Sequence, residues 1–412
     1  MKGIIMDNIE RRTDLIKIIE AIDISPIMYN NAVKKYKSLA GYLESHGLNA
    51  DFYPQGSFAL GTVTRPYAKD NDKSYDLDFI CQVYTDKDNI SPKELRDQIK
   101  DILEAGELYG GKLVVEDECF TIEYAEIGSV GFSIDIVPAA DETNDKKMKL
   151  QSESDRPDLI GTSIAIPRNS QQKVYNWITN NPKGYRKWFD EINAPFAYCT
   201  RDEYRKRMFE SNRELFSSIE DVPEELNRSS LQRVIQILKY HRDVYYFRAF
   251  GEKANSMKPI SAIINTIVAR ISEKADPALS PIELLQFVLS EFSVYSKQTK
   301  HSEMYFKQNY PGKTVIKKEK GKWIIENPAN PEDNLANKWN ENSKIPEAFF
   351  KWVSVAKVQL IDSLYLSDES FRADIEAAFG RKTVQNAWGT KYYNETPKVI
   401  PSNKYAKPWR NN

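Results

Sequence analysis

The first 165 residues combine two hydrophobic periods, one typical of helices and one typical of strands. Apolar residues recur at helical spacing in 10–22 and again after Pro26, where the stripe ends before Gly47. Shorter apolar runs have the length of buried strands, and they lie at 77–83, 113–116, 120–125 and 132–138. Ser91 and Glu94 form a helix start signal between the first two runs. The pattern predicts an α+β lobe.

Helical spacing dominates the chain after residue 165. The predicted helices are 171–180, 201–216, 230–247, 260–274, 281–297, 347–366 and 369–379. A hairpin is predicted near 313–325, with Lys320 and Gly321 close to its tip. From about residue 383, prolines and weak periodicity predict an irregular tail. We therefore divide the chain into a first lobe (1–165), a mainly helical lobe (166–382) and a tail (383–412).

Charge and composition limit the classes of function. Lys and Arg number 58 against 59 Asp and Glu, which gives a net charge of −1. Such a chain lacks the basic field that holds long nucleic acid, although local basic clusters can still bind small anions. We find no signal-peptide core and no run near the roughly 20 apolar residues of a membrane span. Three scattered cysteines give no disulfide framework, so we expect a cytoplasmic protein without membrane contact.

Paired acids at the head of an apolar run are the main candidates for chemistry. Asp76 and Asp78 stand two residues apart in YDLDF, so on a strand both carboxylates point to the same face. Like charges this close repel unless a cation lies between them, which indicates a divalent metal site. Asp135 in FSIDIVP would complete the set, because a lone carboxylate in an apolar run is costly. Upstream, Gly56 and Ser57 offer a turn with backbone N–H groups and a hydroxyl for a phosphate.

Two acids alone are a weak signal, because such a pair often only caps a strand. The combination with a Gly-Ser pair upstream and an acid in a later apolar strand is far more specific. Metal-assisted phosphoryl transfer needs a cluster of hard oxygen ligands of this kind, able to hold two Mg²⁺ ions. The sequence contains no P-loop or dinucleotide fingerprint, which argues against those enzyme classes.

The pattern Gly56-Ser57, Asp76-x-Asp78 and Asp135 resembles the nucleotidyltransferase superfamily of the DNA polymerase β type. Within it, QGSFALGT followed by YDLDFICQV resembles the bacterial cGAS/DncV-like nucleotidyltransferases (CD-NTases), the cyclic oligonucleotide synthases of CBASS anti-phage systems. The resemblance spans most of the chain. It implies a catalytic lobe with a mixed sheet and an N-terminal spine helix, followed by a helical lobe like that of oligoadenylate synthase.

The resemblance also implies roles for single residues. Asp76, Asp78 and Asp135 would be the catalytic metal ligands, with Asp76 and Asp78 on both of two Mg²⁺ ions and Asp135 on the ion that activates the nucleophile; Mn²⁺ is an alternative metal. The residues expected to hold the nucleotide are Gln55, Gly56, Ser57, Lys239 and Ser261. Lys239 lies on the basic face of the predicted helix 230–247, and a plain solvated face is the alternative interpretation. Ala262 stands where animal relatives often carry a base-stacking tyrosine.

A second segment carries the resemblance into the helical lobe. Asn327, Pro328, Pro331 and Asn334 form an NPxxPxxN pattern that resembles the corresponding segment of oligoadenylate synthases. A rigid connection between helices, shaped by the prolines, is the alternative interpretation. We use this segment to support the family resemblance and assign it no catalytic role.

The activity implied by the resemblance is synthesis of a cyclic di- or trinucleotide from NTPs, with release of pyrophosphate. ATP would be among the substrates, and the cyclic product would activate a downstream effector in anti-phage signalling; a regulatory protein partner is left open. Two other functions remain to be distinguished. One is a linear, template-independent nucleotidyltransferase acting on RNA or protein. The other is a nucleotide-binding module without catalysis, although all three acids are present.

Overall fold

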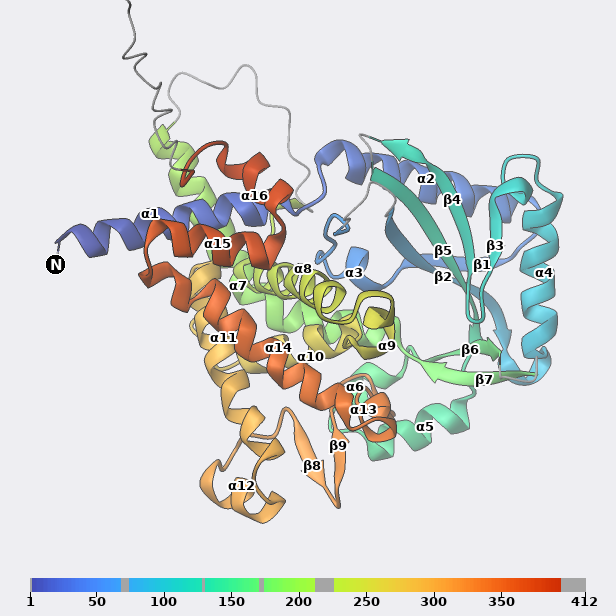
Figure 1. The fold of residues 1–412 in the computed structure, drawn as a ribbon. Coiled ribbons are helices and arrows are strands. Elements are labelled where there is room, and N and C mark those ends of the chain that lie inside the picture. The colour runs from blue at the N-terminus through green and yellow to red at the C-terminus, as the bar shows by residue number, and fades with distance from the viewer. Residues whose placement is uncertain (1, 68–73, 128–129, 170–173, 212–225, 394–412) are drawn as a thin grey trace, which may run out of the picture.

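The structure, a computed structural model, describes residues 2–67, 74–127, 130–169, 174–211 and 226–393. Two lobes make up the molecule (Figure 1): a twisted sheet with its covering helices on the right, and a helical lobe on the left. The long first helix, α1 (Lys2–Ala21), runs along the helical lobe and leads into α2 (Pro26–Ser45), which lies against the sheet. None of the helices in the described ranges is long and apolar enough to cross a membrane.

One mixed sheet organises the first lobe. Its strands are β1 (Ala50–Pro54), β2 (Ser74–Asp86), β3 (Leu113–Val115), β4 (Phe120–Ile127), β5 (Val130–Asp141), β6 (Ile164–Asn169) and β7 (Tyr175–Asn180). The order is β1-β2-β5-β4-β3, and β6 pairs with β5 and β7. β2 and β5 run parallel at the centre, while the other described pairs are antiparallel. This confirms the predicted mixed sheet.

The two faces of β2 have different partners, because successive side chains point to opposite sides of a strand. Tyr75, Leu77 and Phe79 are buried in a core shared with α2 and α4 (Pro92–Ala105). The predicted start of α4 is confirmed, since the side chains of Ser91 and Glu94 form a reciprocal capping box. The remaining face of β2 is therefore free to present Asp76 and Asp78 away from this core.

The sequence-based prediction of a helix at 171–180 was wrong. Residues Tyr175–Asn180 form β7 and pair along β6, with Pro167 opposite Trp177 and Ile166 opposite Ile178. The segment YNWITN is rich in aromatic and β-branched residues, which pack well on a pleated surface, and this tertiary pairing overrides the helical spacing. The sheet thus continues to residue 180, and the boundary proposed at 165 lies inside β6.

Helix α7 (Pro182–Ser211) starts well before the predicted residue 201. The next long helices of the described chain follow the predicted order: α8 (Ser230–Phe250), α10 (Ser261–Ser272), α11 (Pro281–Tyr295), α14 (Lys344–Leu360) and α15 (Asp368–Phe379). A further helix that the sequence pattern did not predict, α16 (Arg381–Trp388), follows them. Short helices connect them or the strands: α3 (Gly56–Ala59), α5 (Asn144–Glu153), α6 (Pro157–Ile160), α9 (Ala254–Met257), α12 (Glu303–Asn309) and α13 (Asn337–Glu341). α8 crosses the middle of this lobe and packs against α7, α10, α11, α14 and α15.

The hairpin near 313–325 is confirmed. β8 (Lys317–Glu319) pairs with β9 (Lys322–Ile324), and both Lys320 and Gly321 have positive φ at the tip, as the tightest hairpin turns require. β10 (Glu326–Asn327) and β11 (Asn330–Asn334) follow. There the Asn334 side chain turns inward: its Oδ1 accepts from the N–H groups of Ile325 and Ala336, so this segment is a braced connection.

The tail does not become irregular at residue 383. Residues 383–388 complete α16, and Trp388 Nε1 donates to the carbonyl of Asp14 on α1 at 2.9 Å. The buried Asp14 carboxylate also accepts from the Tyr392 hydroxyl at 2.7 Å and pairs with Lys391. Apolar burial of Trp388 and these polar contacts attach residues 388–392 to the first helix. Residues 394–412 lie outside the described chain.

His241 on α8 is expected to make folding stability depend on pH. The ring is 1% exposed, its Nδ1 accepts from Trp352 Nε1 at 2.8 Å, and burial lowers its pKa to about 4. The unfolded chain, with a pKa near 6.5, binds the proton between pH 6.5 and 4, so stability falls as pH falls through that window. We expect the unfolding free energy to decrease by about 2 kcal/mol between pH 7 and pH 5 from this group.

Denaturant unfolding at the two pH values measures this decrease. In His241→Gln the part of the decrease in unfolding free energy that comes from the His241 ring should disappear. His301→Gln, which replaces an exposed histidine, should show the same decrease as wild type. An equal pH dependence in wild type and His241→Gln would contradict the assignment.

Candidate active site

A sharp turn at Gly56 brings the chain between β1 and α3 close to β2. The Gln55 N–H donates to the Asp78 carbonyl at 2.9 Å, and Gly56 has a φ of +62°. A Cβ at Gly56 would lie 2.7 Å from Asp78 Oδ2, so only glycine fits without a shift. The predicted Gly-Ser turn is in fact the first turn of the short helix α3. Ser57 follows directly and faces the same cavity as Asp78.

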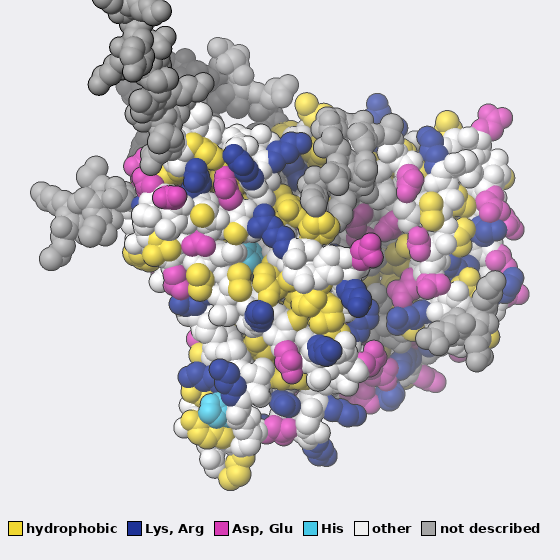
Figure 2. All heavy atoms as spheres, viewed as in Figure 1, with side chains coloured by type: hydrophobic (Ala, Val, Ile, Leu, Met, Phe, Trp, Pro, Cys, Tyr) yellow, Lys and Arg dark blue, Asp and Glu magenta, His cyan; other side chains and the backbone are white. Residues whose placement is uncertain are grey.

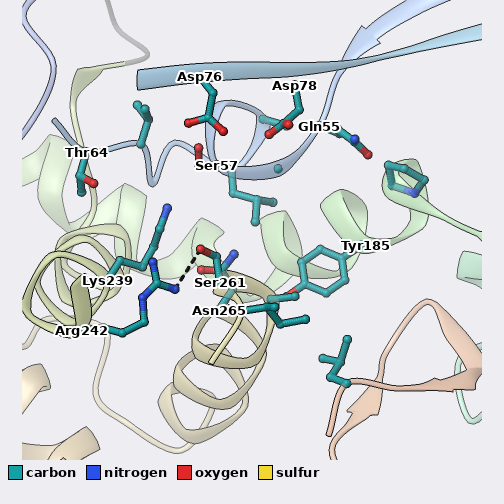
Figure 3. Close-up of a pocket in the computed structure, with 18 of the residues that line it drawn as sticks. Gln55, Ser57, Thr64, Asp76, Asp78, Tyr185, Lys239, Arg242, Ser261 and Asn265 are labelled. Atoms are coloured by element: carbon teal, nitrogen blue, oxygen red, sulfur yellow. Dashed lines mark hydrogen bonds between the residues drawn. The ribbon is translucent and has the colours of Figure 1, made fainter. Parts of the chain in front are cut away.

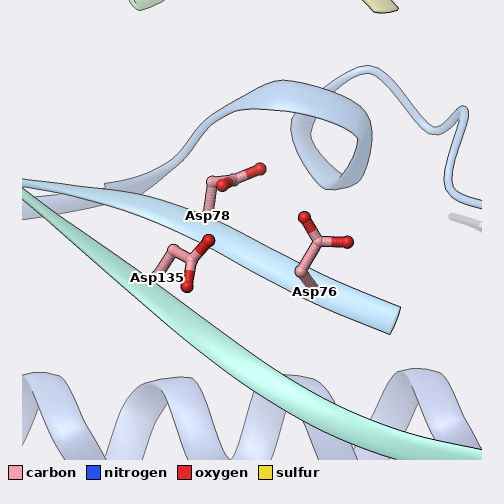
Figure 4. A group of neighbouring side chains, drawn as sticks. All are labelled: Asp76, Asp78 and Asp135. Carbon is pink, nitrogen blue, oxygen red and sulfur yellow. The ribbon is translucent and has the colours of Figure 1, made fainter. Parts of the chain in front are cut away.

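Three carboxylates converge beside this turn (Figure 4). Asp76 and Asp78 project from the same face of β2, and the parallel register places Asp135 of β5 directly beside Asp78. One oxygen of each carboxylate lies within 4.8 Å of the others. Asp76 is exposed, while Asp78 and Asp135 are half-buried. The expected juxtaposition of the three acids is confirmed.

Burial and mutual repulsion raise the free energy of the charged carboxylates when no cation lies between them. Burial, followed by the charges of Asp76 and Asp135, raises the pKa of Asp78 well above its usual range. Burial also raises the pKa of Asp135. The Thr121 hydroxyl, which donates to Asp135 Oδ1 at 2.6 Å, opposes this rise because it stabilises the charged carboxylate. A divalent cation would remove this repulsion, and hard carboxylate oxygens are the ligands that Mg²⁺ prefers. The three residues therefore fit the expected metal site.

Asp76 and Asp78 border a cavity of about 890 Å³ between the two lobes. From the first lobe Gln55, Gly56, Ser57, Asp76 and Asp78 line it, and from the helical lobe Lys239, Arg242, Ser261, Asn265 and Tyr185. Figure 3 shows the two groups facing each other across the open space. All five residues predicted to hold the nucleotide thus reach one cavity, whose volume suits a ligand of nucleotide size or larger.

Lys239 is a buried cation at this cavity. The side chain is 5% exposed, and its Nζ donates to the Thr62 carbonyl at 3.0 Å. Burial and the nearby Arg242 lower its pKa to about 8, while Asp76 opposes the shift. The interpretation as a plain solvated basic face is therefore wrong, because the helix presents this lysine to the interior of the site.

Arg242 and Ser261 are joined on the same wall. Arg242 Nη1 donates to Ser261 Oγ at 3.2 Å and to the Pro259 carbonyl at 3.1 Å, while Asp243 neutralises the guanidinium at 3.0 Å. The sequence motifs assigned no role to Arg242. Its position three residues after Lys239, one helical turn along, was the signal that could have assigned it.

Several other lining residues were missed, among them Tyr185 on α7 and Asn265 on α10. No motif marks either of them, and the start of α7 was not predicted. Tyr67 also lines the cavity. The residues that follow it, 68–73, lie outside the described chain.

Comparison with known proteins agrees with this geometry. Residues 50–138, which contain the glycine turn and all three acids, match the family described as "Cyclic GMP-AMP synthase DncV-like, nucleotidyltransferase domain". A c-di-GMP synthase from Roseivirga ehrenbergii is 23% identical over 345 residues, covering 82% of this chain and 76% of the relative.

Two solved structures share the fold over most of their length. The CD-NTase CdnG of Bradyrhizobium diazoefficiens, solved in complex with GTP, has a TM-score of 0.62 at 19% identity, covering 91% of this chain and 96% of that one. CdnC of Escherichia coli MS115-1, in a complex with HORMA-deltaN, has a TM-score of 0.55 at 15% identity, covering 90% and 96%. The predicted fold class, a polymerase-β-like α+β lobe followed by a helical lobe, is confirmed.

Proposed function

We propose that this chain, a member of the DncV-like nucleotidyltransferases, joins NTPs into a cyclic di- or trinucleotide and releases pyrophosphate. The observation that carries the proposal is the cluster of Asp76, Asp78 and Asp135 within 4.8 Å beside a large cavity. The similarity to a c-di-GMP synthase and to a CdnG bound to GTP makes GTP the first substrate to test, with ATP second.

The carboxylates would hold the metal. Asp76 and Asp78 would bind two Mg²⁺ ions, for which Mn²⁺ can substitute. Asp135 would bind only the ion next to the attacking hydroxyl. Bound there, such ions supply charge neutralisation for the triphosphate and lower the pKa of the nucleophile. The Thr121 hydroxyl, which donates to Asp135 at 2.6 Å, would keep that carboxylate oriented.

The chain's own cations and hydroxyls would bind the triphosphate. Ser57 and the backbone at Gly56 lie on one side of the cavity, and Lys239 lies opposite, where its ammonium can reach a phosphate oxygen. Arg242 holds Ser261 in place through its 3.2 Å hydrogen bond. With the triphosphate fixed between the lobes, the 3′- or 2′-hydroxyl of one nucleotide attacks the α-phosphate of the next, and pyrophosphate leaves. A second, intramolecular attack would close the ring.

Lys239 is expected to make nucleotide binding weaken at alkaline pH. Its pKa of about 8 means that the ammonium loses its proton, and its attraction for phosphate, as pH rises from 7 to 9. We expect KM for NTP to rise by ~10-fold over this range, because the charged fraction of Lys239 falls by about that factor between pH 7 and pH 9. In Lys239→Arg the profile should be flat, because the guanidinium stays charged. A flat wild-type profile, or one shared by the arginine variant, would contradict this role.

The surface supports small nucleotides over long nucleic acid as substrates. Figure 2 shows acidic and basic side chains intermixed on the face drawn, in keeping with the net charge of −1. A protein that binds long RNA or DNA would gather basic residues along one face. The linear transferase on RNA is therefore the less favoured alternative.

The proposed biological setting is bacterial anti-phage signalling of the CBASS type, in the cytoplasm. The cyclic product would activate a downstream effector. A regulatory protein is a further proposed partner, because the similar CdnC forms a complex with HORMA-deltaN.

Pyrophosphate release tests the proposed chemistry. Purified protein with GTP and ATP should release pyrophosphate with Mg²⁺ or Mn²⁺, and EDTA should abolish the release. Release of orthophosphate without pyrophosphate, or undiminished turnover in EDTA, would count against nucleotidyl transfer. Absence of any turnover with intact nucleotide binding would favour the non-catalytic module.

A further inference from the structure

A buried amide oxygen on α10, at the wall of the cavity, lacks a hydrogen-bond partner in the described part of the chain. Asn265 is 4% exposed, lines the cavity, and its Oδ1 has no hydrogen-bond partner among the described residues. Leaving a buried amide oxygen unpaired costs free energy, so such a group usually meets a ligand or a water. Ser261 and Asn265 stand four residues apart, on the same side of the helix and about 6 Å apart along its axis.

An aromatic ring lies next to this amide. Tyr185 of α7 lines the cavity with its ring partly exposed, and its hydroxyl forms a 2.8 Å hydrogen bond with Thr266 Oγ1, the residue after Asn265. The polar end of the tyrosine is thus satisfied inside the protein, and what it offers the cavity is the flat apolar ring. Ala262, whose methyl group takes little room, completes this part of the wall.

The start of α7 is held rigidly, which fixes the ring. The Asn181 side chain, 2% exposed, donates to the carbonyls of Leu159 and Ala329 at 2.8 and 3.0 Å. Its Oδ1 accepts from the Gly184 N–H at 2.9 Å, and a Cβ at Gly184 would lie 2.4 Å from Asn181 Nδ2. A ring carried by such an anchored helix start is pre-organised for stacking, because no loop has to be ordered when a ligand binds.

The position of this pair fits the base of a nucleotide whose phosphates lie at the acids. In Figure 3 Lys239 and Arg242 lie on one side of Ser261, and Tyr185 lies on the other. A nucleoside triphosphate is long and has a flat base at the end away from its charge. With the triphosphate between Lys239 and the carboxylates, the base would extend past Ser261 toward Tyr185.

We propose that Tyr185 and Asn265 form the nucleobase subsite of this chain, with the base stacked on the Tyr185 ring and one of its N–H groups donating to Asn265 Oδ1. The inference rests on the proposed function only in taking nucleotides as ligands. Stacking is tolerant of base identity, since every base has a π face. The Asn265 amide contacts the edge of the base. Because its oxygen accepts and its NH₂ donates hydrogen bonds, it discriminates among bases by their pattern of donors and acceptors.

Binding measurements separate this subsite from the phosphate site. The probes are the α,β-methylene analogues of GTP and ATP with Mg²⁺, which bind without turnover, and inorganic tripolyphosphate, which has no base. We expect Tyr185→Leu to weaken binding of both analogues by ~10-fold or more, the loss typical of one stacked base. Tyr185→Phe keeps the ring and should stay within ~3-fold of wild type, since it loses only a hydrogen bond inside the protein. Tripolyphosphate should bind all three proteins alike.

The ratio of the affinities for the GTP and ATP analogues tests the role of Asn265 in base recognition. Asn265→Ala should weaken the better-bound analogue by ~10-fold and bring the GTP and ATP analogues closer together, because the edge contact is lost. Unchanged analogue binding in Tyr185→Leu and Asn265→Ala, or an equal loss for tripolyphosphate, would overturn the subsite. If wild type shows this base-dependent binding yet makes no pyrophosphate, the proposed function fails while the subsite stands. If wild type binds tripolyphosphate but neither analogue more tightly, the subsite is wrong.

Discussion

Replacing both Asp76 and Asp78 with asparagine is expected to lower NTP consumption by ~10⁴-fold, or about 5.5 kcal/mol of transition-state stabilisation. The amides keep the shape of the side chains but remove the two charges that would hold the metal. The pKa of Asp78 is already raised by burial and by its neighbours, so losing these charges relieves repulsion in the folded protein. The thermal midpoint should therefore stay constant or rise while activity falls.

Asp86→Asn is the matched control, because Asp86 is an exposed acid at the far end of the same strand. It should retain wild-type turnover. Turnover in Asp76→Asn/Asp78→Asn within tenfold of wild type would contradict the role of the carboxylates. A drop in both stability and turnover would assign the loss to misfolding, which the thermal midpoint reveals.

Gly56→Ala is expected to produce the second largest loss of activity, on the order of 10²-fold in kcat/KM. Two causes combine: φ is +62°, a region that alanine rarely adopts, and the new methyl group would lie 2.7 Å from Asp78 Oδ2. Either the turn or the carboxylate must move, and a displacement of this size at a metal ligand misplaces the reacting groups. Folding stability should fall by about 1–2 kcal/mol from the backbone strain.

Gly47→Ala separates strain from displacement. Gly47 also has a positive φ, +88°, but a Cβ there meets nothing within 4 Å, and it lies at the end of α2 away from the cavity. This variant should lose a similar amount of stability and keep its activity. Equal activity losses in both variants would show that strain alone acts, and near-normal activity of Gly56→Ala would remove the argument for close contact between the turn and Asp78.

The acidic cluster could be predicted from the sequence because its determinants are local. Period-2 alternation places Asp76 and Asp78 on one face, and the cost of burying a lone acid marks Asp135. The parallel register that sets Asp78 beside Asp135 could not be derived, since it depends on pairing between segments far apart in the chain. The resemblance to a known family supplied that neighbourhood in advance.

What the sequence could not show depends on tertiary contacts. The segment 175–180 has helical spacing but pairs with β6, which no local pattern reveals. Trp388 and Tyr392 seemed part of an irregular tail because their partner, Asp14, stands at the other end of the chain. Tyr185 and Asn265 belong to no motif, and only the cavity identifies them.

The most direct test of the central claim is a mass spectrum of the product. Purified protein is incubated with all four NTPs and Mg²⁺, treated with phosphatase, and analysed beside Asp76→Asn/Asp78→Asn. The account predicts a phosphatase-resistant species with the mass of two or three nucleoside monophosphates less one water for each linkage, absent from the variant. Linear oligonucleotides or free nucleosides alone in the wild-type reaction, or the same cyclic product from the variant, would contradict it.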